Sequence, residues 1–241
     1  MHHALYVALV TASLLGFRHG FDYDHIAAIT DVVSVQPSKG PAMRLGMVYA
    51  LGHAVTVALL GSLVILFGIN LPAGIDRYAE RLVGLTLLLL GIYVLATLIF
   101  KPGQLPKSRY ALFHQTYDRI RVAMNPTTSQ PRTAPATFDA SSVFVIGIVH
   151  GLGAETPSQL LIFLLAANLG GAALGMLGLG MFLAGLLTMN MLMTASVAGV
   201  FGVSRHRPRV LRVVSALTAV YSLVMGVIFL AGHSILLPAL N

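Results

Sequence analysis

Apolar residues dominate this chain in six stretches that are separated by shorter polar segments. The stretches cover residues 4–33, 43–69, 78–100, 141–168, 171–202 and 211–237. A helix needs about 20 apolar residues to cross the ~30 Å hydrocarbon core of a bilayer, and every stretch meets that length. The pattern therefore predicts an all-α fold, a polytopic membrane helix bundle with about six transmembrane helices. The first and fifth stretches are long and contain glycine or polar residues, which indicates tilted or broken helices.

The composition agrees with a membrane protein. Of 241 residues, 56% are hydrophobic and only 10% are charged, whereas about a quarter of the residues of a soluble domain are charged. The formal net charge is +7. In a membrane protein such an excess marks cytoplasmic loops, so we predict no nucleic-acid partner. The chain has no cysteine, which excludes thiolate chemistry and disulfides.

The basic residues predict an orientation. Twelve of the fifteen lie in or beside the segments 34–44, 101–140 and 203–212, which fall on one side of a six-span arrangement. The positive-inside rule makes these segments cytoplasmic and both termini external, in a multi-pass protein of the cell inner (plasma) membrane. Segment 101–140 is then a cytoplasmic linker loop. It separates a first three-span half, residues 1–100, from a second, residues 141–241.

Two similar segments indicate an internal repeat. "GFRHGFDYDHI" (16–26) and "GIVHGLGAETP" (147–157) share the pattern G-x-x-H-G-apolar-x-x-acid, which pairs His19 with His150 and Asp24 with Glu155. Glycine and apolar matches are common by chance in such a chain, but a matched histidine and acid are not. Each segment lies in the first span of a three-span half. Because three is an odd number, the two halves have opposite orientations in the membrane. The pattern thus predicts a 3+3 inverted repeat, as in many secondary transporters.

The first apolar stretch contains a cluster of ionisable side chains. Isolated charges in a membrane cost roughly 2.5–3.5 kcal/mol each on insertion scales, so a cluster indicates function. In an ideal helix His19, Asp22 and His25 share one 120° arc, while Asp24 points about 140° away from His19. Unwinding of the helix at Gly20 would bring Asp24 to the same ligand. Imidazole and carboxylate together suit a divalent transition metal.

A purely structural role is an alternative to metal binding for these side chains. Arg18 and Asp22 can form a structural ion pair, with the histidines filling cavities. His53, alone in the second stretch, is either an ordinary core histidine or a further ligand. His150 and Glu155 are candidate ligands because the repeat pairs them with His19 and Asp24. Asn190, in the fifth stretch, either supplies an oxygen or makes a hydrogen bond between helices.

These residues also carry a family resemblance. His19-x4-Asp24-His25 within "RHGFDYDHI" resembles the H-x4-D-H motif of the nickel/cobalt transporter family (NiCoT), and "LGHAVTV" (51–57) resembles its LGHSTVV motif. The resemblance implies uptake of Ni²⁺ or Co²⁺, with His19, Asp24 and His25 essential and His53 in the second motif. The chain departs from the family in its predicted topology, since family members commonly have eight spans and internal termini, and in two segments of its sequence. "GLGAETPSQ" stands where the family has G-F-D-T-A-T-E. The family's later Asp-rich span is replaced in this chain by "LAGLLTMNMLMTA", which contains Asn190 and no acid.

We therefore expect a secondary transporter for divalent transition-metal ions, most of all for Ni²⁺ or Co²⁺ uptake. The predicted metal ligands are His19, Asp22, Asp24, His25, His53, His150 and Glu155. No G-x4-G-K-[ST] motif is encoded, and no resident cofactor or enzymatic activity is expected. The alternatives are an intramembrane metalloenzyme, a metal-binding accessory membrane protein and a metal exporter. The expected partners are the metal ion and the lipid bilayer, and homo-oligomerisation is left open.

Overall fold

The computed structural model describes residues 2–68, 74–99, 138–153, 157–204, 207–233 and 237, and every element among them is a helix. The prediction of an all-α fold is confirmed for this part of the chain. The helices are α1 (His2–His19), α2 (Tyr23–Ser34), α3 (Lys39–Phe67), α4 (Ile75–Ile99), α6 (Ala140–Gly153), α7 (Pro157–Ser204) and α8 (Pro208–Leu230).

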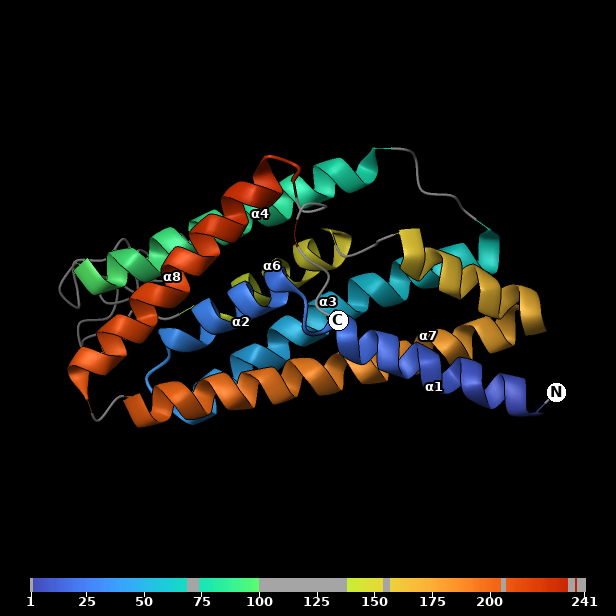
Figure 1. The fold of residues 1–241 in the computed structure, drawn as a ribbon, viewed down its shortest axis with the longest axis horizontal. Helices are drawn as coiled ribbons and strands as arrows, with labels where there is room; N and C mark the ends of the chain where they lie inside the picture. Colours follow the sequence, from blue (N-terminus) through green and yellow to red (C-terminus); the bar gives the residue numbers. More distant parts are fainter. Residues whose placement is uncertain are drawn as a thin grey trace, which may run out of the picture.

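The helices pack in pairs around a short central helix (Figure 1). α4 lies along α8, α1 lies along α7, and α3 contacts both α6 and α7. The short helix α2 touches α3, α4, α6, α7 and α8. Nine of its twelve residues are buried, including two aspartates and a histidine. The most polar part of the first apolar stretch therefore lies in the middle of the bundle.

Glycines allow two of the helix pairs to approach closely. A Cβ atom on Gly16 would collide with the backbone of Phe182, and one on Gly185 would collide with the backbone of Ser13, so α1 and α7 touch backbone to backbone. Gly147 makes the same kind of approach between α6 and α3, against Tyr49. Small residues serve this purpose where helices associate in membranes. These contacts fix the ends of α1 and α6 that carry the candidate histidines.

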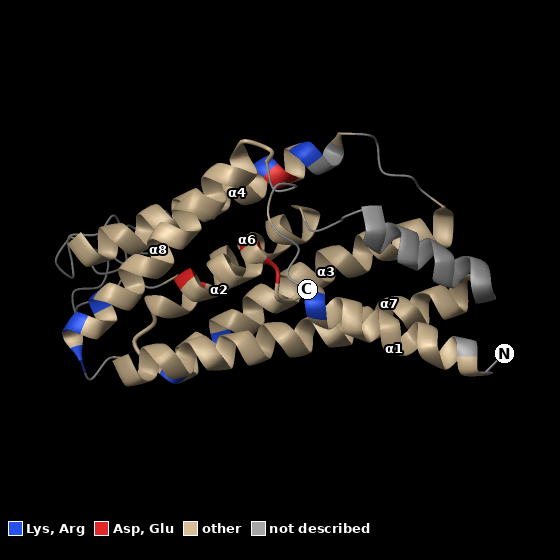
Figure 2. Ribbon diagram, in the orientation of Figure 1, with Lys and Arg blue, Asp and Glu red and all other residues tan. Residues whose placement is uncertain are grey.

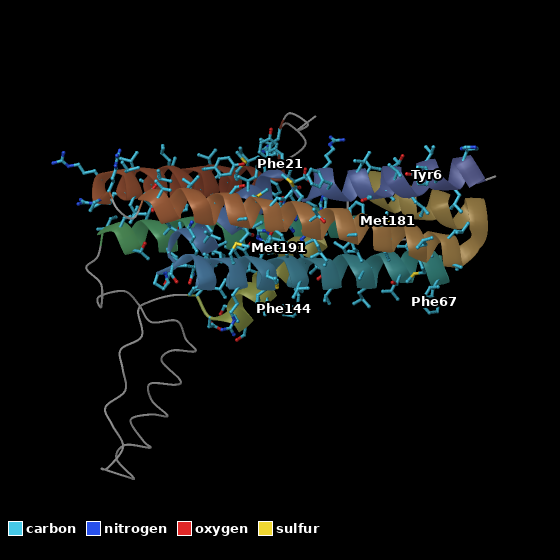
Figure 3. The ribbon with its side chains drawn as sticks, turned by 90° about the horizontal axis from the view of Figure 1, so that it is seen from below. Tyr6, Phe21, Phe67, Phe144, Met181 and Met191 are labelled. Carbon is cyan, nitrogen blue, oxygen red and sulfur yellow. The ribbon has the colours of Figure 1, made fainter. Side chains whose placement is uncertain are left out.

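The outer surface is apolar, as a bilayer requires. Four helical segments are long and apolar enough to cross a membrane: Lys39–Phe67, Arg77–Ile99, Gly171–Ser204 and Pro208–Leu230. Leu5–His19 and Ala140–Gly153 are shorter apolar helices. Tyr6 and Phe67 are among the large apolar side chains that point away from the bundle (Figure 3). A membrane protein is thus supported, while the number of six crossings stays a prediction.

One group of basic residues lies at the end of the bundle where α3 and α8 begin, and others lie near the start of α4 and at the end of α1 (Figure 2). Lys39 begins α3, and its side chain lies against Gly202 near the end of α7. Arg207 is the N-cap of α8, which begins at the same end. This agrees with the predicted grouping of basic loops on one side. Which compartment that side faces stays a prediction, and most of the linker loop, residues 101–137, lies outside the described residues.

Candidate metal centre

The first apolar stretch is interrupted where the sequence places its ionisable groups. α1 ends at His19 and α2 begins at Tyr23. The break is a tight turn, in which the amide of Phe21 donates to the Arg18 carbonyl at 2.9 Å and that of Asp22 to the His19 carbonyl at 3.1 Å. Asp22 itself is extended, with φ −69° and ψ 159°. The helix therefore unwinds just after Gly20, as predicted, and Asp24 turns towards the interior.

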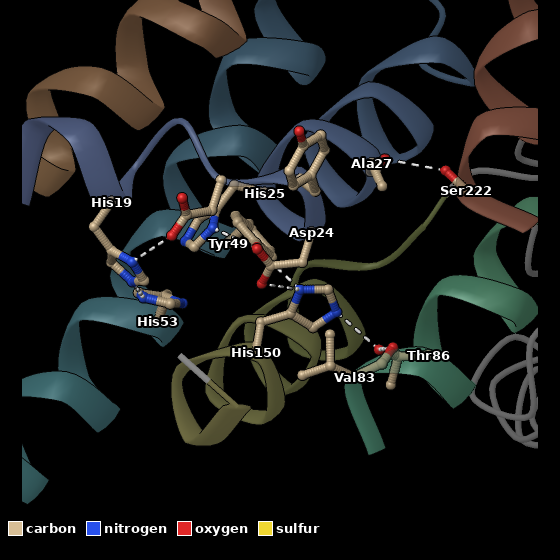
Figure 4. Close-up of polar contacts among 12 residues, drawn as sticks. His19, Asp24, His25, Ala27, Tyr49, His53, Val83, Thr86, His150 and Ser222 are labelled. Carbon is tan, nitrogen blue, oxygen red and sulfur yellow. Dashed lines mark hydrogen bonds and ion pairs between the residues drawn. The ribbon is translucent and has the colours of Figure 1, made fainter. Parts of the chain in front are cut away.

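Three buried histidines meet at this break. His19 comes from the end of α1, His25 from the first turns of α2 and His53 from the middle of α3. One ring nitrogen of each lies within 4.8 Å of the other two. The Nε2 atoms of His19 and His53 are 3.3 Å apart. We call these three side chains the histidine group (Figure 4).

Two carboxylates hold the histidines from behind. Asp22 Oδ2 accepts a hydrogen bond from His19 Nδ1 at 2.8 Å, and Asp24 Oδ1 accepts one from His25 Nδ1 at 3.0 Å. Each bond fixes the neutral tautomer that carries its proton on Nδ1 and its lone pair on Nε2. His25 Nε2 is buried and has no hydrogen-bond partner. This is the carboxylate–histidine arrangement that orients imidazoles towards a metal.

The separation of the nitrogens suits a shared ion. Metal–nitrogen bonds to imidazole are about 2.0–2.1 Å long in zinc sites. Two nitrogens 3.3 Å apart can bind one ion at such lengths with an angle of about 107°, close to tetrahedral. Without an ion, two Nε2 lone pairs would face each other unless one ring were protonated or changed tautomer. The arrangement therefore has the chemistry of a cation site.

The candidate ligand His150 lies on the other side of Asp24. Its Nδ1 is 3.6 Å from Asp24 Oδ2 and 3.1 Å from the hydroxyl of Tyr49. Its Nε2 is 2.8 Å from Thr86 Oγ1. The Thr86 hydroxyl donates to the Val83 carbonyl, so its oxygen accepts the proton of His150 Nε2. Both nitrogens of His150 thus have protein partners, and the ring contacts the histidine group through Asp24.

The other sequence candidates are placed unequally. Asp22 is at the edge of the site, with its side chain 43% exposed, and it lies behind His19. Its bond to His19 gives it a role other than the structural pairing with Arg18 that the sequence also allowed. Asn190 is fully buried on α7 with both amide atoms lacking a hydrogen-bond partner. Glu155 lies outside the described residues.

Sequence reasoning did not single out two partners of His150. Tyr49 precedes His53 by four residues on α3, so it lies on the same helix face, and that spacing was a usable signal. Thr86 lies on α4, in a run of leucines, and the sequence gives no sign that its hydroxyl meets His150. Phe182 of α7 was also missed; its ring stacks on His19 with centroids 5.7 Å apart.

Comparison with known proteins supports the interpretation that this site binds a metal ion. The chain is 25% identical to the nickel transporter NixA of Staphylococcus aureus, over 74% of the chain and 56% of NixA. It is 23% identical to the urease accessory protein UreH of Bacillus sp., over 91% of the chain and 88% of UreH. A shorter match, 41% identical over 58 residues, is to the cobalt transport protein NhlF of Rhodococcus rhodochrous, covering 24% of the chain and 16% of NhlF.

These similarities have clear bounds. The chain spans little more than half the length of the NixA protein that it matches. No family model matches the chain, and no solved structure matches it. Along most of its length the chain is nevertheless similar to proteins named as nickel transporters, and it resembles the nickel/cobalt transporter family.

Proposed function

We propose that this protein moves a divalent transition-metal ion, Ni²⁺ or Co²⁺, across the cell inner membrane, and that the histidine group binds the ion on its way. The observation that carries the proposal is the meeting of three buried imidazoles at a helix break inside an apolar bundle. Ionisable groups at such a place are costly to bury and mark substrate pathways. The nickel and cobalt transporters among its relatives support the choice of cargo.

The residues divide into ligands and positioning groups. His19, His25 and His53 present Nε2 lone pairs to the ion, and Asp22 and Asp24 fix the tautomers of the first two rings. This assigns the two aspartates an indirect role, in place of the direct ligation that their spacing suggested. Neutral imidazole favours Ni²⁺ over Co²⁺ in the usual order of affinities, but a three-histidine set accepts both.

The second half of the molecule packs against the first half around the site. Gly16 and Gly147 hold equivalent positions in the two repeat segments, and each makes a close helix contact, with α7 and with α3 respectively. Equivalent contacts of this kind are what a 3+3 inverted repeat produces. His150, the counterpart of His19, then lies beside Asp24 with its Nδ1 3.6 Å from Oδ2, and Glu155 is expected near it as a further acid.

The membrane potential supplies enough energy for uptake. Moving two charges through ~100 mV releases about 4.6 kcal/mol, which corresponds to roughly three decades of accumulation. Neutral histidines bind the ion and protonated ones do not, so binding weakens on acidification. Both facts are compatible with a secondary transporter that has no nucleotide motor.

Ion uptake by the purified chain in proteoliposomes tests the proposal. With an inward-negative potential, the wild-type protein should accumulate Ni²⁺, and His25→Ala should abolish uptake because one of three ligands is lost. His233→Ala is the matched control, since His233 is exposed and follows the end of α8. Binding of Ni²⁺ without flux would favour an accessory metal-binding protein, and undiminished uptake by His25→Ala would refute the site.

A further inference from the structure

A second acid lies deep in α2 and has no evident structural purpose. Asp31 is fully buried, and neither of its carboxylate oxygens has a hydrogen-bond partner. It follows Asp24 by seven residues, which puts both acids on one face of the helix, about 10 Å apart along the axis. Ala27 and Ala28, both fully buried, occupy the turn between them.

The surroundings of Asp31 provide no countercharge in the described part of the chain. Of the helices packed against α2, α8 presents the hydroxyl of Ser222, which faces the carboxyl group and lies 3.5 Å from the Ala27 carbonyl. α7 contributes no titratable residue between 171 and 204. Several titratable groups of the other helices make contacts elsewhere.

Those groups fall into two sets. The first set surrounds the Asp24 end of α2: His53 and Tyr49 of α3, His150 of α6, and Tyr221 of α8, whose hydroxyl donates to the Tyr23 carbonyl at 3.3 Å. The second set lies beyond the other end. There Tyr93 of α4 packs on Phe138, and Arg44 of α3 lines a pocket with Gln36 and Asp139. None of these contacts involves Asp31.

The absence of a positively charged partner near Asp31 in the described part of the chain indicates which ligand the acid can bind. An ionised carboxylate that is buried alone is very unfavourable. A divalent metal ion would need several further donors, and Asp31 has only one hydroxyl facing it. A single proton neutralises the acid and requires no other ligand. The chemistry of the position therefore fits a proton.

We propose that Asp31 is a proton-binding site that is coupled to the histidine group: a divalent cation bound by the histidines causes Asp31 to release its proton. The inference rests on the proposed function, because it needs a cation in the histidine group. The neutral carboxyl group becomes a carboxylate, and the proton passes to solvent. By reciprocity, protonation of Asp31 weakens cation binding to the same degree, which gives the transporter a means to release its cargo.

Proton release on binding tests the coupling. Calorimetric titration of the full chain in detergent with Ni²⁺, in buffers that differ in ionisation enthalpy, counts the protons released per ion. Asp31→Asn should lower that count by at least half a proton between pH 6 and 8 and reduce the pH dependence of the affinity equally. Asp31→Glu should restore both. Asp139→Asn removes an acid at the pocket and should leave the count unchanged.

An infrared difference spectrum keeps the proposal testable if Asp31→Asn does not fold. Addition of Ni²⁺ to the wild-type protein should remove the band of a protonated carboxyl group. Persistence of that band, or equal proton release by wild type and Asp31→Asn, would overturn the inference and leave the transporter proposal standing. A wild-type protein that binds no Ni²⁺ would overturn both.

Discussion

Replacement of Asp24 by asparagine tests whether this acid acts through His25. The change keeps the size of the side chain but removes the charge that holds the proton on His25 Nδ1, 3.0 Å away. Across the ring the carboxylate would lie roughly 6 Å from a bound dication, and Coulomb's law at an effective dielectric constant of 20 gives an upper estimate of about 5.5 kcal/mol. Outer carboxylates of metal sites typically contribute 10- to 100-fold in affinity, or about 1.4–2.7 kcal/mol. We expect a loss in that lower range.

A double-mutant cycle separates an orienting acid from a direct ligand. Isothermal titration of Ni²⁺ into detergent-purified wild type, Asp24→Asn, His25→Ala and the double variant gives the four affinities. If Asp24 works through the ring, its replacement costs much less once His25 is gone, and the coupling energy is about 1 kcal/mol or more. Asp139→Asn, an acid bonded to Ser141 and Ser142 at the start of α6, is the control.

The refuting outcome is additivity. If Asp24→Asn weakens binding equally with and without His25, the carboxylate meets the ion directly or acts only by its charge. The bond between Asp24 and His25 would then not contribute to ion binding. A loss of less than threefold in the wild-type background would also remove Asp24 from the site.

Three further predictions concern stability and orientation. Asp139→Ala should lower the free energy of unfolding at neutral pH by about 1 kcal/mol, because Asp139 caps α6. Partial burial raises the pKa of Asp139, but hydrogen bonds from Ser142 and Ser141 outweigh it and hold the pKa below its usual value. The contribution is thus present above pH ~4 and lost as the pH falls through the lowered pKa, and equal denaturation curves for both proteins at pH 7 would contradict it. Gly185→Val should destabilise the α1–α7 contact by about 1–3 kcal/mol, whereas Gly199→Val, which meets open space, should not; equal thermal melting of the two variants would argue against the contact. A reporter fused to the C-terminus should be active only outside the cytoplasm, and a cytoplasmic signal would contradict the predicted orientation.

The hydrophobic pattern predicted the helices better than their pairing. The stretches 43–69, 78–100 and 211–237 correspond closely to α3, α4 and α8, because apolar length alone decides where a bilayer helix can form. The break after Gly20 was also predictable, since Asp24 would otherwise point away from His19. Which helices pack together was not, because that depends on close backbone contacts between residues far apart in sequence.

The sequence predicted which residues form the candidate site better than it predicted the role of each residue. The spacing of His19, Asp24 and His25 places them near one another, but it does not say which atom of an acid accepts a proton from which ring. Only the turn between α1 and α2 decides that Asp22 and Asp24 lie behind the histidines. Asp31 lies in the first apolar stretch, but the sequence does not show that it lacks a hydrogen-bond partner. That becomes apparent only in the structure, where five helices contact α2.

His19 and His150 share a sequence pattern but have different partners, and the difference follows from the helices around them. His19 directs its Nε2 towards His53, where another imidazole offers a nitrogen at 3.3 Å. His150 meets hydroxyl groups of Tyr49 and Thr86 instead, and these occupy both of its nitrogens. A repeat of two such segments therefore need not give two equal halves of a site. In our interpretation one histidine of the pair binds the ion, while the other is held by Tyr49 and Thr86 and lies beside Asp24, with its Nδ1 3.6 Å from Asp24 Oδ2.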